Sequence, residues 1–119
     1  MPKPDDSTRL HHMLDAARDA VQFTQGRSRR SLHTNKMLEL ALTRLLEIIG
    51  EAAREISGEL QAAYPETAWH KMSGMRNRLI HGYFDVDQDM VWETVTRELP
   101  PLIAQLENIL EELDTKPCI

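Results

Sequence analysis

The chain of 119 residues is long enough for one ordinary domain and too short for two. Apolar residues make up 41% and charged residues 28%, which is typical of a soluble globular protein. The net charge is −5, and it is unevenly distributed along the chain. Residues 1–84 carry 12 basic and 10 acidic side chains, whereas residues 85–119 carry 2 basic and 9 acidic side chains. A uniformly basic surface is therefore excluded, and any anionic ligand is expected to bind the first two-thirds of the chain.

The first predicted helix follows Asp6 and Ser7, both favourable N-cap residues, and ends at Gly26. A basic connector, residues 27–31, leads to a longer predicted helix over about residues 38–56. In both segments the apolar residues recur every three or four positions. The apolar arc of the second helix is wide, which indicates contacts on two sides.

A turn or two of helix around Leu60 precedes a third long helix, from about Glu66 towards Gly82. Residues 84–87 are predicted to form a loop, with Asp87 as the cap of the last helical segment. Apolar residues recur there over three heptads, and Pro100-Pro101 predicts a kink or break. No segment alternates with a period of two. We therefore expect an all-α fold, an antiparallel bundle of four or five helices over residues 1–119.

Several other features limit the class of protein. The single cysteine, Cys118, excludes an intrachain disulfide and suits a reducing compartment. No apolar run approaches the roughly 18 residues that span a bilayer, and residues 1–6 lack the apolar core of a signal peptide. We therefore expect a cytoplasmic protein. We interpret the apolar heptad stripe of the last helical segment as part of the core, and likewise Met72 and Met75. The alternative that the stripe is a coiled-coil seam for a partner helix stays open.

One dense polar cluster lies at the end of the third long helix: Arg76, Asn77, Arg78, His81 and Tyr83. Successive helical residues are 100° apart, so Asn77 and His81 share a stripe whereas Arg76 and His81 diverge by about 140°. An unbroken helix would not aim Arg76 and His81 at one ligand. Either the helix end is loosened, or two copies face each other across a dimer, whose cleft would suit a phosphodiester.

A structural interpretation of this cluster stays open. The arginines can pair with carboxylates, and a histidine near a helix C-terminus complements the helix dipole. No metal or cofactor is predicted, because the histidines lack metal-ligand spacing and the glycines form neither a dinucleotide-binding motif nor a P-loop. Glu66 and His70 are four residues apart, which is common by chance.

Arg76, His81 and Tyr83 resemble the R-X4-6-H-X-Y signature of the HepT family, small helical toxins of the HEPN ribonuclease superfamily. The resemblance covers roughly residues 7–113. It extends to flanking blocks: residues 48–53, Trp69, residues 83–87, Val91-Trp92 and Leu99-Pro100.

This resemblance implies roles for several residues of the cluster. Arg76 and His81 would be the catalytic pair, Tyr83 would be the motif tyrosine, and Asn77 matches the polar residue that often follows the motif arginine. By its residue type Arg78, together with Asn77, is a candidate for a supporting contact to the substrate phosphate. The resemblance also implies an RNA substrate, a homodimer with a shared cleft, and a toxin–antitoxin pair. The partner would be a minimal nucleotidyltransferase antitoxin that silences the toxin by adding AMP groups to Tyr83.

The residue types suit metal-independent RNA cleavage. The RNA 2′-hydroxyl attacks its own phosphate, so the protein must exchange protons and neutralise charge. An imidazole such as His81 exchanges protons near neutral pH, and a guanidinium such as Arg76 matches phosphate oxygens. Two alternatives stay open: a non-catalytic nucleotide-binding adaptor that pairs with a nucleotidyltransferase, and a plain dimerising bundle.

Gly50 and Glu51 lie in the middle of the second long helix, where glycine costs about 1 kcal/mol relative to alanine. Close approach of another helix at Gly50 would explain the glycine. A functional interpretation, in which Glu51 orients an arginine of the site, stays open beside it.

Overall fold

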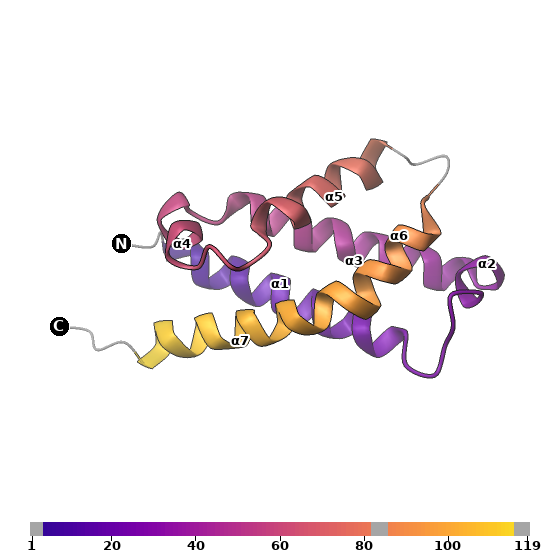
Figure 1. Cartoon of the computed structure of the whole chain (residues 1–119), viewed down its shortest axis with the longest axis horizontal. Coiled ribbons are helices and arrows are strands. Elements are labelled where there is room, and N and C mark those ends of the chain that lie inside the picture. The colour runs from indigo at the N-terminus through magenta and orange to yellow at the C-terminus, as the bar shows by residue number, and fades with distance from the viewer. Residues whose placement is uncertain (1–3, 82–85, 116–119) are drawn as a thin grey trace.

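The computed structural model describes residues 4–81 and 86–115, and all regular structure within these ranges is helical (Figure 1). The expectation of an all-α fold is therefore confirmed. Gly82, Tyr83, Phe84, Asp85 and Cys118 lie outside the described residues. The elements in chain order are α1 (Pro4–Phe23), α2 (Ser31–Thr34), α3 (Lys36–Glu55), α4 (Gly58–Ala63), α5 (Trp69–His81), α6 (Gln88–Glu93), the π-helix η1 (Thr94–Glu98) and α7 (Leu99–Thr115).

The four long helices, α1, α3, α5 and α7, run alternately in opposite directions (Figure 1). Helix α3 packs against both α1 and α5, and α1 packs in turn against α7. This explains the wide apolar arc of α3. The two methionines of α5, Met72 and Met75, are buried in the core. Five residues of the expected heptad stripe are also buried, and its two end residues, Trp92 and Leu113, are partly buried against the core: the buried five are Val95, Leu99, Leu102, Leu106 and Ile109. Within the described ranges, no helix combines the length and apolar character that a bilayer crossing requires.

Side-chain caps fix several helix starts. Asn35 Oδ1 accepts from the Leu38 amide at 3.1 Å, and Ser57 Oγ accepts from the Leu60 amide at 3.3 Å. Asp87 caps α6, as predicted, because its Oδ1 accepts from the Met90 amide at 2.9 Å.

The prediction for Asp6 as an N-cap is wrong. Helix α1 begins at Pro4, and Asp6 lies fully buried in its first turn. Its Oδ1 accepts from the Ser57 amide at 3.0 Å and its Oδ2 from the Ser57 hydroxyl at 2.6 Å. Asp6 therefore joins the start of α1 to the cap of α4, a contact between residues 51 positions apart in the chain.

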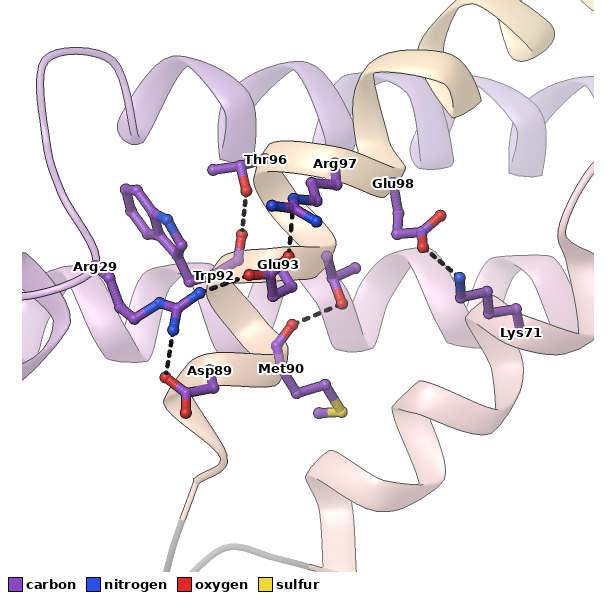
Figure 2. A network of polar contacts seen from close by, with 10 residues as sticks. Arg29, Lys71, Asp89, Met90, Trp92, Glu93, Thr96, Arg97 and Glu98 are labelled. Carbon is purple, nitrogen blue, oxygen red and sulfur yellow. Dashed lines mark hydrogen bonds and ion pairs between the residues drawn. The ribbon is translucent and has the colours of Figure 1, made fainter.

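The two prolines produce a π-helical segment. Neither Pro100 nor Pro101 can donate a backbone hydrogen bond, and just before them the Leu99 amide bonds to the Thr94 carbonyl, five residues back. The Thr96 hydroxyl donates to the Trp92 carbonyl at 2.7 Å (Figure 2). The helical path bends between α6 and α7, so the predicted interruption is present as a π-helix (Figure 1).

Acidic side chains of α6 and η1 are paired with basic side chains from earlier in the chain (Figure 2). Arg29, from the basic connector, lies 3.3 Å from Asp89 and 2.5 Å from Glu93. Lys71 of α5 forms an ion pair with Glu98. Part of the uneven charge along the chain is thus neutralised across the fold.

Candidate active site at the end of helix α5

Helix α5 is unbroken from Trp69 through His81. The divergence of about 140° between Arg76 and His81 therefore holds within one chain. Arg76 is half-buried in the seam with α3, whereas Asn77, Arg78 and His81 are exposed. Within one chain the structure thus does not bring Arg76 and His81 together.

Gly50 lets the two helices approach closely at Arg76. A Cβ atom built on Gly50 would lie 2.4 Å from the Arg76 Cβ and 2.6 Å from the Met72 carbonyl oxygen. Real side chains essentially never make such short contacts. The expected close approach at Gly50 is confirmed, and the helix it admits is the one that carries Arg76.

The guanidinium of Arg76 is buried at its Nε and bonded at its NH1. Its Nε is buried and has no hydrogen-bond partner among the described residues. Its NH1 donates to Asn77 Oδ1 at 3.4 Å. A buried, unpaired N–H favours an anionic partner, because desolvation strengthens the interaction of a fixed cation with a phosphate.

Arg78 lies on the other side of α5, about 160° from Arg76 around the helix axis. Its NH2 is 3.5 Å from Asp87 Oδ2, and both side chains are more than half exposed. An exposed pair of this kind contributes roughly 0–1 kcal/mol. Arg78 is therefore free to exchange its partner, but it does not join Arg76 within one chain.

Glu51 is exposed and lines a shallow cavity of about 290 Å³ between α1 and α3, together with Arg9 and His12. The structure therefore favours the packing interpretation of this region, with Gly50 as the important residue. Among the described residues, no three His, Cys, Asp or Glu side chains are grouped closely enough to hold a metal ion.

A buried carboxylate, Glu39, lies on the same face of α3 as Gly50 and is not among the residues that the sequence singles out. Glu39 lies eleven residues before Gly50, which returns it to within about 20° on the helix. It bonds to Lys36 at 3.0 Å and accepts from the Gln88 amide of α6. The Gln88 hydrogen bond, aided by Lys36, holds the pKa of Glu39 below its ordinary value of 4.5 although burial opposes this. The spacing of eleven residues between Glu39 and Gly50 is the sequence signal that places both residues on one face of the helix.

Comparisons with known proteins place the chain in a family. A family model described as "Ribonuclease HepT-like" matches residues 13–109. The chain is 35% identical over 116 residues to "Putative RNase MJ1216" of Methanocaldococcus jannaschii, covering 98% of this chain and 96% of the relative. It is 34% identical over 100 residues to "Probable ribonuclease HepT" of Thermococcus cleftensis, covering 84% of this chain and 91% of the relative. No solved structure matches. The chain therefore belongs to the HepT-like family of HEPN ribonucleases.

Proposed function

We propose that the protein is a metal-independent endoribonuclease in which Arg76 and His81 act on one phosphodiester. The observation that carries this proposal is the arrangement of α5. Arg76 is fixed by close packing at Gly50, and His81 is exposed at the last described turn of the same helix. The names of the relatives support the same class of reaction.

The chemistry needs only the groups that RNA and this chain supply. The 2′-oxygen forms a bond to phosphorus as the bond from phosphorus to the 5′-oxygen breaks. One imidazole takes the proton of the 2′-hydroxyl and a proton is returned to the leaving 5′-oxygen. Arg76 neutralises the charge that develops on the phosphate oxygens. The products carry a 2′,3′-cyclic phosphate and a 5′-hydroxyl, and DNA, which lacks the 2′-hydroxyl, is not cleaved.

A homodimer would bring the two groups together. Helix α5 is unbroken, so a second copy is needed to place a His81 opposite an Arg76. Three large apolar side chains of α3 and α5 are exposed and available for such an interface: Met37 (81%), Leu40 (56%) and Ile80 (39%). Leu40 lies about 80° from Gly50 around α3, on the side next to the seam that holds Arg76.

Removal of the His81 imidazole tests the catalytic proposal. His81→Ala is expected to lower the cleavage rate about 10²–10⁴-fold, because a general acid or base typically contributes that much. His11→Ala is the matched control, since His11 is exposed on α1 and its ring bonds only locally, to the Ser7 carbonyl. Cleavage is followed on labelled RNA with EDTA present. A His81→Ala enzyme that cleaves at the wild-type rate, or a requirement for Mg²⁺, would refute the proposal.

Regulation by a partner completes the proposed function. We propose a toxin that a cognate nucleotidyltransferase antitoxin inhibits by transferring AMP to Tyr83, because the added charge and bulk would obstruct a phosphate at the neighbouring His81. With the antitoxin and ATP, the mass should rise by whole AMP units, and Tyr83→Phe should abolish the gain. Tyr64→Phe is the control, since Tyr64 is half-buried and its hydroxyl donates to Glu112 at 3.1 Å. Persistence of the gain in Tyr83→Phe would place the modification elsewhere.

A further inference from the structure

Helix α5 presents a basic face to solvent. The helix contains no acidic residue, although the chain as a whole has a net charge of −5. One stripe of this face recurs at helical spacing: His70, Gly74, Asn77 and His81. Lys71 and Arg78, seven residues apart, flank the stripe on one side. This face therefore carries the charge that a nucleic-acid backbone requires.

A groove of about 270 Å³ runs along this face, between α5 on one side and α6 and η1 on the other. Apolar methionine side chains line it, and basic side chains stand at its edge. We call it the methionine groove and define it by six residues: Lys71, Met72, Gly74, Met75, Arg78 and Met90. Methionine is flexible and polarisable, and its sulfur packs favourably against flat aromatic rings.

Gly74 has no packing explanation. A Cβ atom at Gly74 would meet no atom within 4 Å, in contrast to Gly50, where α5 leaves no room. Glycine is unfavourable inside a helix, so the fold alone would favour alanine at this position. What the glycine does provide is depth in the methionine groove.

The two basic residues at the edge can exchange their partners. Lys71 pairs with Glu98 and Arg78 with Asp87, and three of these four side chains are more than half exposed. Surface ion pairs of this kind are weak, and a phosphate forms at least as good a partner for either cation as a carboxylate does. Both cations belong to α5, so a bound strand would follow the helix that carries His81.

We propose that the methionine groove binds an unpaired nucleobase of the substrate RNA, with flanking phosphates on Lys71 and Arg78. The inference rests on the proposed ribonuclease function and names where the substrate strand lies. Gly74 and His81 share the stripe and are seven residues apart, about 10 Å along the helix. A nucleobase bound in the groove and a phosphate bound at His81 would therefore belong to nearby nucleotides of the same strand.

The test uses a strand that the enzyme cannot cleave, a 2′-O-methyl RNA oligonucleotide with a single abasic site placed at each position in turn. For the wild-type protein, loss of one particular base should weaken binding about five- to tenfold, the lower end of the range for one stacked base. Gly74→Leu places a side chain in the groove and should weaken binding of the intact strand by a similar factor. In this variant the abasic site should have no further effect, because the two changes remove the same contact.

Gly58→Leu is the matched control, since a Cβ at Gly58 also meets no atom within 4 Å and Gly58 lies away from the groove, at the start of α4. It should bind like the wild type. A second variant, Arg78→Gln, should reduce the slope of log affinity against log salt by about 0.7, the value for one phosphate contact of a single strand.

Three results would overturn the groove proposal. The first is wild-type binding affinity in Gly74→Leu, and the second is additive losses of affinity from Gly74→Leu and the abasic site. The third is a change in oligomeric mass caused by Gly74→Leu, which would make the groove an interface between copies of the chain. Cleavage of unmodified RNA is measured separately. Coupled binding without any cleavage would refute the ribonuclease function and leave the groove as a binding site, whereas cleavage without coupling would refute the groove alone.

Discussion

Gly50 acts at the residue scale, because the absence of one Cβ atom sets where Arg76 lies. Alanine at position 50 would place its Cβ 2.4 Å from the Arg76 Cβ, so α5 must move away from α3. Overpacking of this kind costs about 1–3 kcal/mol in stability, and a displacement of about 1 Å in a catalytic group can cost about 10²-fold in rate. We expect Gly50→Ala to fold with reduced stability and to cleave RNA about 10–100-fold more slowly. Urea unfolding and single-turnover cleavage measure the two effects.

Gly58→Ala is the control for this prediction, because the added methyl group meets no atom within 4 Å. It should change neither the rate nor the stability by much. A folded Gly50→Ala protein with the wild-type rate would show that the close approach of the two helices has no effect on Arg76.

Gly50 and Asp6 show what the sequence could and could not predict at the scale of single residues. An isolated glycine inside a strongly helical pattern indicates close packing, and Gly50 was identified on that basis. Its contact, Arg76, depends on how α5 crosses α3 and could not be identified locally. Asp6 was misassigned for a similar reason: N-cap preference is a local property, whereas the partner of Asp6 is Ser57, on another element.

At the scale of the elements, apolar periodicity predicted the long helices but not their irregular parts. Helix α5 begins at Trp69, three residues later than predicted, and α2 (Ser31–Thr34) was not predicted at all. A helix of one turn is too short to show a period. Pro100-Pro101 signalled an interruption, but the choice of a π-helix depends on which carbonyl the Leu99 amide reaches. Short and irregular elements are thus set by hydrogen bonds that no period reveals.

Glu39 links three elements and gives stability that depends on pH. It lies on α3, and Gln88 of α6 donates both to its carboxylate and to the Leu32 carbonyl of α2, the latter at 3.2 Å. Because these bonds lower the pKa of Glu39, its contribution is complete above its ordinary value of 4.5 and is lost as the pH falls towards the lowered value. We expect the free energy of unfolding of the wild type to exceed that of Glu39→Gln at pH 6, and the difference to shrink as the pH falls below about 4.5.

Glu107→Gln provides the comparison, because Glu107 pairs with Arg18 in a half-exposed surface pair. Its difference from the wild type should be small at every pH. A Glu39→Gln protein whose stability runs parallel to that of the wild type from pH 6 to about pH 3 would contradict the assignment.

At the scale of the whole molecule, the fold separates the groups that the proposed chemistry needs. Arg76 lies in the α3–α5 seam, His81 lies on the opposite, exposed face of α5, and exposed apolar side chains flank the seam. The divergence of these two residues could be predicted from the sequence, because the angle follows from helical geometry. The sequence could not show whether the helix end bends, which would have joined them within one chain. Helix α5 is unbroken through His81, so the two residues stay apart within the described chain, and the proposed homodimer is what would join them.

The proposed homodimer makes activity depend on assembly. Leu40→Glu puts a charge into the exposed apolar surface of α3 without touching Arg76 or His81. It is expected to shift the protein from dimer to monomer in light scattering and to lower the cleavage rate in parallel. Phe23→Glu is the matched control, because Phe23 is also an exposed apolar side chain but lies at the end of α1 and not on α3 or α5, and this variant should keep the dimer.

Mixing two inactive variants tests directly whether two chains share one site. Arg76→Ala homodimers lack both arginines of the cleft, and His81→Ala homodimers lack both imidazoles, so each alone should be nearly inactive. When the two are mixed and allowed to exchange subunits, about half of the dimers should be hetero-dimers by random pairing, and each of these keeps one Arg76 and one His81. Cleavage should then reappear on the time scale of exchange. If the site were complete within each chain, no mixture would recover activity, because neither variant contains both groups.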